Sequence, residues 1–190
     1  MSISLRQLPN LISLFRIVLT VPLALALLHR DWAAALVLFA VAAVSDAADG
    51  FLAKRFGWQT DLGALLDPIA DKLLVATVLL TLAVQGSVPI WLMGAAVGRD
   101  LVIVLGAVSY RLWFGHLNMR PTLISKINTL FQLVYILAVV ARREIALPPA
   151  WVVTLFGALV FVTIAVSGLD YVLTYAARAY RAAAARRSAA

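Results

Sequence analysis

Six apolar runs constrain the fold of this chain more than any other feature of its sequence. Each run is close to the roughly 20 residues with which an α-helix crosses the hydrocarbon core of a bilayer. The runs cover about residues 9–29, 32–54, 67–86, 89–114, 122–142 and 148–176. Because that core contains no water, a segment that crosses it satisfies its backbone polar groups within a helix. The sequence therefore predicts an all-α fold, an integral membrane bundle of six transmembrane helices that forms one domain over residues 1–190.

The composition argues against a soluble helical protein with a large core. Hydrophobic residues make up 64% of the chain, charged residues make up 13%, and the mean hydropathy is +0.98. Soluble domains carry about 25% charged residues, so this chain has too few of them to give its helices polar faces. The sequence contains no cysteine, which excludes a disulfide framework and a cysteine metal site.

The distribution of Lys and Arg predicts that both termini lie in the cytoplasm. With the N-terminus placed inside, ten basic residues fall on or near the cytoplasmic side: Arg6, Lys54, Arg55, Arg111, Arg120, Lys126, Arg178, Arg181, Arg186 and Arg187. Only Arg30, Arg142 and Arg143 fall on the opposite side. This bias satisfies the positive-inside rule and places the ends of the second and third spans near the cytoplasmic face.

The net charge of +7 indicates contact with lipid rather than with nucleic acid. The cations flank the predicted spans, where anionic headgroups attract them, so we expect membrane lipids and no nucleic acid as partners. A mildly amphipathic segment before Pro9 predicts a short N-terminal stretch in the membrane interface, and the Arg-rich end predicts a frayed helix on the membrane surface. Alanine-rich usage, small size and no visible targeting extension predict a bacterial inner-membrane protein.

Four carboxylates in otherwise apolar sequence mark the candidate site. Asp46 and Asp49 are three residues apart and Asp67 and Asp71 are four apart, so each pair shares one face of its helix. A charge in the membrane costs about 3 kcal/mol even on a lenient scale. Two helices that each present two oxygen ligands suit two hard divalent cations, Mg²⁺ or Mn²⁺. Such a pair can clamp an in-line phosphoryl displacement, so the four aspartates are the candidate metal ligands.

Two alternatives compete with a metal site. The acids could form structural ion pairs with Lys54, Arg55 and Lys72, but three cations leave negative charge uncompensated on four aspartates plus Asp61. A transporter could instead use intramembrane acids to bind a coupling ion. Inverted repeats would support a transporter, and the sequence shows no internal repeat of that kind.

The acidic segment resembles the signature of the CDP-alcohol phosphatidyltransferases, D-x-x-D-G-x-x-A-R-x8-G-x3-D-x3-D. Seven of the eight fixed positions match over residues 46–71, and the exception is Lys54, where the family has Arg. The six predicted spans and the N-terminal run P-N-L-I-S-L-F-R also fit. Lys offers a point charge instead of the bidentate fork of Arg, so either Lys54 suffices or Arg55 takes the Arg role.

The resemblance implies a role for each matching residue. The four aspartates match a binuclear metal site, and Asp71 also matches the general base that accepts the proton of the acceptor hydroxyl. Residues in or between the first three predicted spans match positions at or near the CDP-diacylglycerol: Asn10, Gly50, Ala53, Lys54, Arg55, Thr60 and Gly63.

Two further segments bear on the acceptor alcohol. Gly98–Asp100 and Pro121–Gln132 resemble segments of CMP-forming cardiolipin synthases, which transfer a phosphatidyl group to phosphatidylglycerol and give cardiolipin and CMP. The D-P-x-A-D-K run that begins at Asp67 is shared with phosphatidylglycerophosphate synthases, whose acceptor is glycerol 3-phosphate, so this alternative stays open. The basic residues expected to bind the acceptor phosphate are Arg99, Arg120 and Lys126. Arg99 could instead pair with Asp100 or with an aspartate of the cluster.

The run Gly94–Gly98 contains the small residues typical of close helix crossings in membranes. It predicts such a crossing either within the chain or between two chains. Since members of the family tend to pair, we expect a homodimer.

Overall fold

The computed structural model describes residues 8–56, 61–114 and 123–188. Within these ranges only the backbone is described for residues 8–9, 47, 49–54, 61–66, 68, 107–114, 123 and 172–188. The chain forms the helices α1 (Leu8–Leu28), α2 (Trp32–Phe56), α3 (Asp61–Val84), α4 (Ile90–Phe114), α5 (Leu123–Ile145) and α6 (Ala150–Ser188). The described residues contain no strand, so the predicted all-α fold is confirmed.

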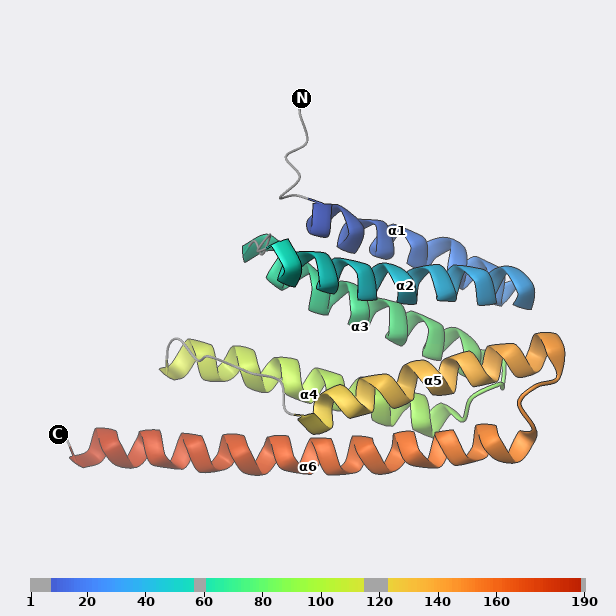
Figure 1. Cartoon of the computed structure of the whole chain (residues 1–190). Helices are drawn as coiled ribbons and strands as arrows, with labels where there is room; N and C mark the ends of the chain where they lie inside the picture. Colours follow the sequence, from blue (N-terminus) through green and yellow to red (C-terminus); the bar gives the residue numbers. More distant parts are fainter. Residues whose placement is uncertain (1–7, 57–60, 115–122, 189–190) are drawn as a thin grey trace.

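The helices form two groups that lie along a common direction (Figure 1). In one group α1 packs against α2 and α3, and in the other α6 packs against α4 and α5. The groups meet where α5 contacts α2 and α3 and where α3 contacts α4. Buried side chains such as Leu23, Leu79 and Ile136 fill the centre. Because lipid is as apolar as leucine, close packing rather than transfer from water holds such helices together.

Local signals in the sequence set the turns between helices. The carboxylate of Asp31 accepts a hydrogen bond of 3.0 Å from the Ala34 N–H and caps α2. Gly86 follows α3 with a φ of 69°, a left-handed conformation that glycine adopts without steric cost. Pro89 precedes α4, and a second proline, Pro149, precedes α6, consistent with the preference of proline for helix starts.

Three helices of the described part are long and apolar enough to cross a membrane: Asn10–Leu28 in α1, Ile124–Ile145 in α5 and Ala150–Tyr171 in α6. Large apolar side chains such as Val18, Val37 and Trp151 are exposed on the outside, as they are on a surface that faces lipid. These features indicate a membrane protein.

Two helix boundaries differ from the predicted spans. Helix α3 begins at Asp61, six residues before the predicted span at residue 67, because the segment 61–66 continues the same helix. Helix α6 continues without a break to Ser188, so the Arg-rich end is helical as predicted but extends the last helix instead of fraying, and its place on the membrane surface stays a prediction. Alanine has the highest helix propensity and arginine a high one, so this stretch extends the helix beyond its apolar part.

Candidate active site

A buried arginine of α1 joins the acidic residues of α2 and α3. The Arg16 side chain is almost completely buried, with 2% of it exposed, and its Nη1 lies 2.7 Å from Asp46 Oδ1. The same nitrogen donates a hydrogen bond to Asp71 Oδ1. Carboxylates from two helices thus share one guanidinium from a third. The side chains of Asp46 and Asp71 remain partly exposed, at 46% and 37%, so both carboxylates are accessible from the site.

A serine one turn earlier on α1 contacts the third described aspartate. Ser13 is fully buried, and its hydroxyl donates a hydrogen bond to Asp67 Oδ1. Ser13 and Arg16 are three residues apart and therefore lie on one face of α1. This polar face of an apolar helix supplies a partner to each of Asp46, Asp67 and Asp71.

Neither Ser13 nor Arg16 is among the site residues predicted from the sequence. In the sequence both belong to the N-terminal run P-N-L-I-S-L-F-R, which spacing alone connects to no partner. The signal was the cost of a charge within a span, since an intramembrane arginine requires an acidic partner. The alternative in which Lys72 pairs with an acid of the cluster is not observed among the described residues. Instead, Lys72 Nζ lies 2.6 Å from Asp100 Oδ2.

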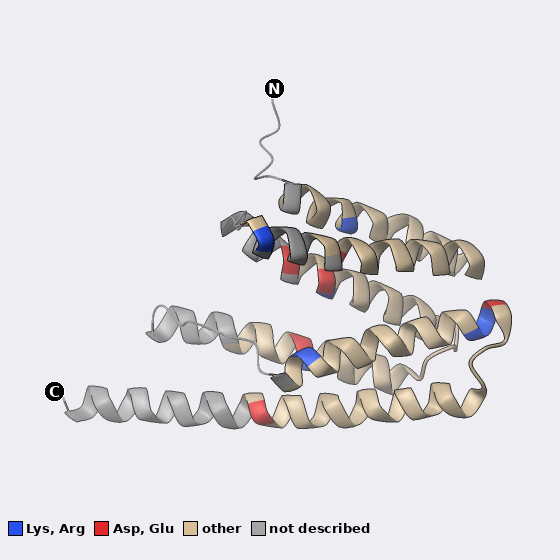
Figure 2. Ribbon diagram, in the orientation of Figure 1, with Lys and Arg blue, Asp and Glu red and all other residues tan. Residues whose placement is uncertain are grey.

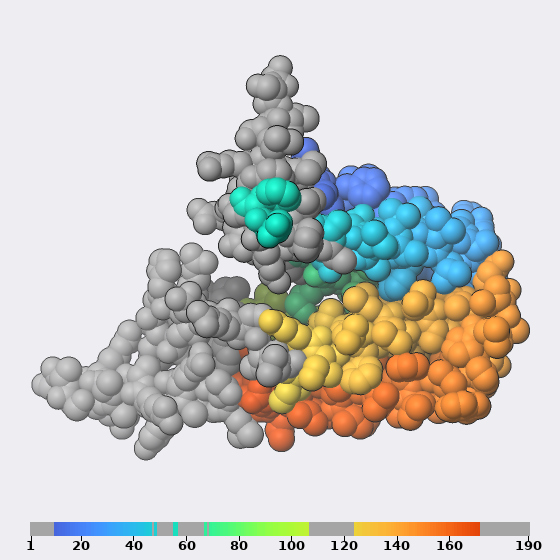
Figure 3. All heavy atoms as spheres, in the orientation of Figure 1, coloured from blue at the N-terminus to red at the C-terminus, as the bar shows by residue number. Residues whose placement is uncertain are grey.

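A small cavity of about 70 Å³ adjoins Asp46 and Asp71. Its lining comes from α1, α2, α3 and α5: Arg16, Phe39, Ala42, Ala43, Asp46, Asp71, Leu74, Val75, Thr129 and Leu133. We call it the α2–α5 cavity. Figure 3 shows a hollow in the molecular surface beside α2 and α5. Its polar lining residues are Arg16, Asp46, Asp71 and Thr129, and apolar side chains form the rest.

A second, more polar pocket of about 260 Å³ adjoins the other side of the acidic cluster. Its lining comes from α3, α4 and α5: Asp67, Asp71, Lys72, Val75, Asp100, Ser125, Lys126, Thr129 and Gln132. We call it the polar pocket. Asp71 borders both spaces, so its carboxylate lies between them. Lys126 is exposed and has no ion-pair partner in the described part of the chain.

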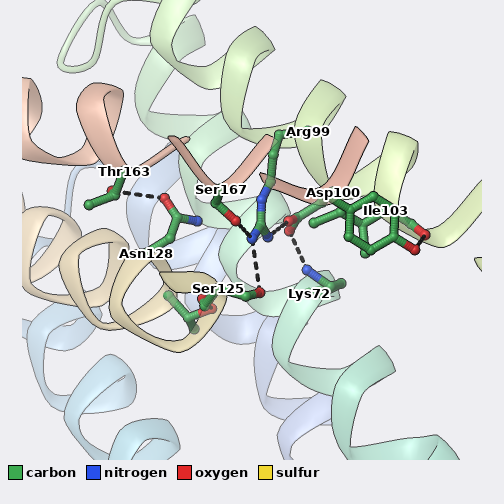
Figure 4. Close-up of polar contacts among 10 residues, drawn as sticks. Lys72, Arg99, Asp100, Ile103, Ser125, Asn128, Thr163 and Ser167 are labelled. Carbon is green, nitrogen blue, oxygen red and sulfur yellow. Dashed lines mark hydrogen bonds and ion pairs between the residues drawn. The ribbon is translucent and has the colours of Figure 1, made fainter. Parts of the chain in front are cut away.

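Arg99 belongs to a buried network behind this pocket (Figure 4). Its Nη1 lies 2.7 Å from Asp100 Oδ1, and its Nη2 donates hydrogen bonds to Ser125 Oγ at 2.9 Å and to Ser167 Oγ. Arg99 therefore ties α4 to α5 and α6. The expected pairing with Asp100 is confirmed. Arg99 is 6% exposed and does not line the polar pocket. Among the described residues, the cations that line this pocket are Lys72 and Lys126.

Two buried amides of α5 have unused donors. Asn128 Oδ1 accepts a hydrogen bond of 3.0 Å from Thr163 Oγ1, but within the described residues its Nδ2 has no partner. Gln132 is 3% exposed and lines the polar pocket, and in the same part of the chain its Nε2 is also unpaired. In the sequence Gln132 is only the last residue of the segment Pro121–Gln132.

Charged residues gather in one half of the bundle, with a separate group at the far end of α5 (Figure 2). Several predicted site residues lie on described backbone without described side chains: Asp49, Gly50, Ala53 and Lys54 in α2, and Gly63 in α3. Thr60 and Arg120 lie outside the described residues. Asn10 is half-buried on α1, and Arg55 is exposed near the end of α2.

The run Gly94–Gly98 does not mediate a close crossing among the described parts of the chain. A Cβ atom placed on Gly94 or Gly98 would meet no neighbouring atom within 4 Å. The prediction of a crossing within the chain was therefore wrong at this place. Because α4 packs through other positions, these two glycines border free space.

The donor chemistry of the acidic cluster fits a hard divalent cation. Asp46, Asp67 and Asp71 offer only oxygen ligands, and the position of Arg16 shows that Asp46 and Asp71 can share one positive charge. Among side chains that the structure describes, no group of three or more His, Cys, Asp or Glu is close enough to hold a metal ion. The side chain of Asp49 is not among the described ones, so that statement does not cover it.

Comparison with known proteins agrees with the signature. The family model of the CDP-alcohol phosphatidyltransferases matches residues 6–165. The chain is 33% identical over 149 residues to a Rattus norvegicus protein named cardiolipin synthase (CMP-forming), a match covering 70% of this chain and 49% of the relative. It is also 33% identical over 180 residues to a probable phosphatidylglycerophosphate synthase of Mycobacterium tuberculosis, covering 87% and 80%.

A third relative gives higher identity over a shorter stretch. The chain is 44% identical over 104 residues to a CDP-diacylglycerol–glycerol-3-phosphate 3-phosphatidyltransferase of Pseudomonas fluorescens, covering 51% of this chain and 52% of the relative. The chain spans about half the length of the cardiolipin synthases it matches. A relative named cardiolipin synthase and one named probable phosphatidylglycerophosphate synthase thus match at the same identity.

Proposed function

Because the chain belongs to the CDP-alcohol phosphatidyltransferase family, we propose that it transfers a phosphatidyl group from CDP-diacylglycerol to the hydroxyl of a glycerol-type acceptor. One observation carries this proposal: carboxylates of α2 and α3 from the family signature converge on one cation, Arg16, and one of them, Asp71, borders two cavities. A reaction of two large substrates needs such a centre with space on both sides.

The proposed acceptor is phosphatidylglycerol, which gives cardiolipin and CMP. The support is the resemblance of Gly98–Asp100 and Pro121–Gln132 to cardiolipin synthases. The second candidate acceptor is glycerol 3-phosphate, and it is favoured by the longer match to a probable phosphatidylglycerophosphate synthase. Both reactions transfer the same group, so they differ only at the acceptor side of the site.

Two divalent cations, Mg²⁺ or Mn²⁺, complete the proposed site. The residues that would hold them are Asp46, Asp49, Asp67 and Asp71. When bound, such ions neutralise phosphate oxygens and acidify a nearby hydroxyl. Arg16 and Ser13 keep three of these carboxylates in place from α1, so the cluster does not depend on its own helices alone for orientation.

In the proposed step, the acceptor hydroxyl oxygen attacks the phosphorus that bears diacylglycerol. A new phosphorus–oxygen bond forms, the proton passes to the Asp71 carboxylate, and the bond to CMP breaks with its electron pair leaving on CMP. Asp71 borders both cavities, as a base between the two substrates must. Lys54 or Arg55 stabilises the charge that develops on CMP, and positioning supplies much of the rest.

We also propose the finer membrane arrangement. All six helices cross a bacterial inner membrane, both termini lie in the cytoplasm, the active site lies near the cytoplasmic face, and the protein forms a homodimer. The basic residues support the orientation, and the free space beside Gly94 and Gly98 leaves room for a second helix.

The test of the function is an assay of CMP release. Purified protein in lipid nanodiscs receives radiolabelled CDP-diacylglycerol with phosphatidylglycerol, with glycerol 3-phosphate, or with no acceptor, in Mg²⁺, Mn²⁺ or chelator. We expect release of CMP with labelled cardiolipin only when phosphatidylglycerol and a metal are both present. Labelled phosphatidylglycerophosphate would establish the second candidate. No CMP with any acceptor, together with ion flux in vesicles, would establish a transporter.

A further inference from the structure

A wide apolar groove lies beside the polar pocket. It has a volume of about 530 Å³ and is lined by residues of α3, α4 and α5: Ile69, Lys72, Leu73, Val75, Ala76, Leu79, Ala96, Val97, Asp100, Leu101, Val104 and Gln132. We call it the α3–α4 groove. Of its walls, Leu73 and Leu101 are exposed on the outside of the bundle. In a membrane this groove is therefore accessible from the acyl-chain region.

The groove continues into the active site. Lys72, Val75, Asp100 and Gln132 line both the groove and the polar pocket, and the pocket extends from there to Asp71. One surface thus runs from an apolar wall, past an ion pair, to the proposed base. A phospholipid carries its groups in the same order: an apolar acyl chain, then a phosphate, then a headgroup with a hydroxyl.

Hydrogen-bond donors stand at the junction of groove and pocket. Lys72 Nζ is held at 2.6 Å from Asp100 Oδ2, and Gln132 Nε2 is buried without a partner among the described residues. A buried amide that lacks a partner destabilises the folded protein. An oxygen-rich group at the junction would remove that cost, and Lys126 on the pocket wall adds a second cation.

The two substrates need separate approaches to Asp71. In an in-line displacement the entering and leaving oxygens lie on opposite sides of the phosphorus. Of the described acids of the signature, Asp46 lines the α2–α5 cavity and does not line the polar pocket. The polar pocket, into which the α3–α4 groove continues, contains Asp71 and Lys126. Because Lys126 is one of the basic residues expected to bind the acceptor phosphate, we assign this side to the acceptor.

We propose that the α3–α4 groove binds an acyl chain of the acceptor phospholipid, whose phosphate and glycerol headgroup occupy the polar pocket. The inference rests on the proposed function and deepens it, because it makes the acceptor a membrane lipid rather than a water-soluble phosphate. A chain that leaves the bilayer for an apolar groove gains little free energy, since both are equally apolar. The groove therefore acts by orienting the headgroup toward Asp71.

A binding measurement tests the groove without relying on turnover. Phosphatidylglycerol with a photoreactive diazirine in one acyl chain is incorporated with the full chain in nanodiscs, irradiated, and the labelled residues are located by mass spectrometry. We expect labelling at Leu73, Val97 and Leu101. CDP-diacylglycerol with the same diazirine is the matched probe, and we expect it to label other positions.

Labelling of the groove by the CDP-diacylglycerol probe alone would overturn the inference, as would labelling by neither lipid. Cross-links between two chains through α4 with no lipid label would assign the groove to a second copy and overturn it equally. Groove labelling by phosphatidylglycerol without CMP release would instead contradict the proposed function and leave the lipid site standing. CMP release with phosphatidylglycerol but label elsewhere would contradict only the groove.

A substitution gives a second readout. Ala76→Phe places a ring in the groove, and Ala158→Phe places the same ring on the exposed surface of α6. We expect Ala76→Phe to lower kcat/KM for phosphatidylglycerol roughly tenfold more than for glycerophosphoglycerol, the same headgroup without chains. Ala158→Phe should lower both equally or neither. An equal loss for both acceptors in Ala76→Phe would contradict a chain in the groove.

Discussion

Arg16 Nη1 lies 2.7 Å from Asp46 Oδ1, so a residue of the first helix holds the first acid of the signature. The same guanidinium reaches Asp71, 55 residues away along the chain. An arginine in this position does two things at once. It lowers the cost of placing two carboxylates within an apolar bundle, and it fixes the rotation of α1 relative to α2 and α3.

We predict that Arg16→Ala destabilises the protein by about 3 kcal/mol in the absence of metal, because two carboxylates lose their shared buried cation. Thermal or denaturant unfolding in detergent with chelator measures the loss. Arg143→Ala, at an exposed position that faces the Trp32 ring from 5.9 Å, is the control and should cost under 1 kcal/mol. Equal losses for the two variants would contradict the structural role of Arg16.

A linked prediction concerns metal. If the carboxylates can take a divalent ion, added Mn²⁺ should stabilise Arg16→Ala more than the unsubstituted protein, since binding to the folded state adds stability. The melting temperature of each is measured across a Mn²⁺ titration. Asp67→Asn should reduce the response in both backgrounds. A response that Asp67→Asn leaves intact would exclude Asp67 as a ligand.

Asp71→Asn should lower CMP release on the order of 10²–10⁴-fold, because the amide cannot accept the acceptor's proton. The folded state should persist, as judged by elution volume and helical circular dichroism. Asp31→Asn is a matched control, because Asn caps a helix as well as Asp does and Asp31 lies at the start of α2. Retained turnover in Asp71→Asn would remove Asp71 from the role of base.

Substitution of Arg99 should lower the stability of the protein, whereas substitution of Lys126 should weaken binding of the acceptor. Arg99→Ala breaks bonds from α4 to α5 and α6 and leaves the Asp100 carboxylate with one fewer partner, so it should cost about 2–4 kcal/mol of stability. Lys126→Ala should leave stability nearly unchanged and raise the acceptor KM, because Lys126 is exposed on the polar pocket. Unfolding and acceptor titration separate the effects. An unchanged KM in Lys126→Ala would contradict acceptor binding by this residue.

The orientation is tested by single cysteines in a chain that has none of its own. Glu144→Cys, at the exposed end of α5, should react with a membrane-impermeant maleimide in intact cells. Arg55→Cys, near the end of α2, should react only after permeabilisation. The reverse pattern would place both termini outside, and labelling of both in intact cells would contradict a span between them.

Sequence patterning was sufficient for the helices and for the identity of the acidic cluster. Apolar runs of membrane-spanning length predicted all six helices, and spacings of three and four placed each aspartate pair on one helix face. The partners were not predictable in the same way. Lys72 is adjacent in sequence to Asp71, yet it pairs with Asp100 on α4, because the two side chains leave α3 in different directions.

By itself, then, the sequence determined where helices form, which stretches are apolar and which acids belong to the family signature, since these depend on neighbours within one or two turns. Only the tertiary structure decided that Arg16 and Ser13 hold the acids, that Arg99 is tied to Ser125 and Ser167, and that Asp71 borders two spaces. The physical reason is that pairing between helices depends on their rotation and register. Packing over the whole bundle sets these, and spacing along one chain segment does not.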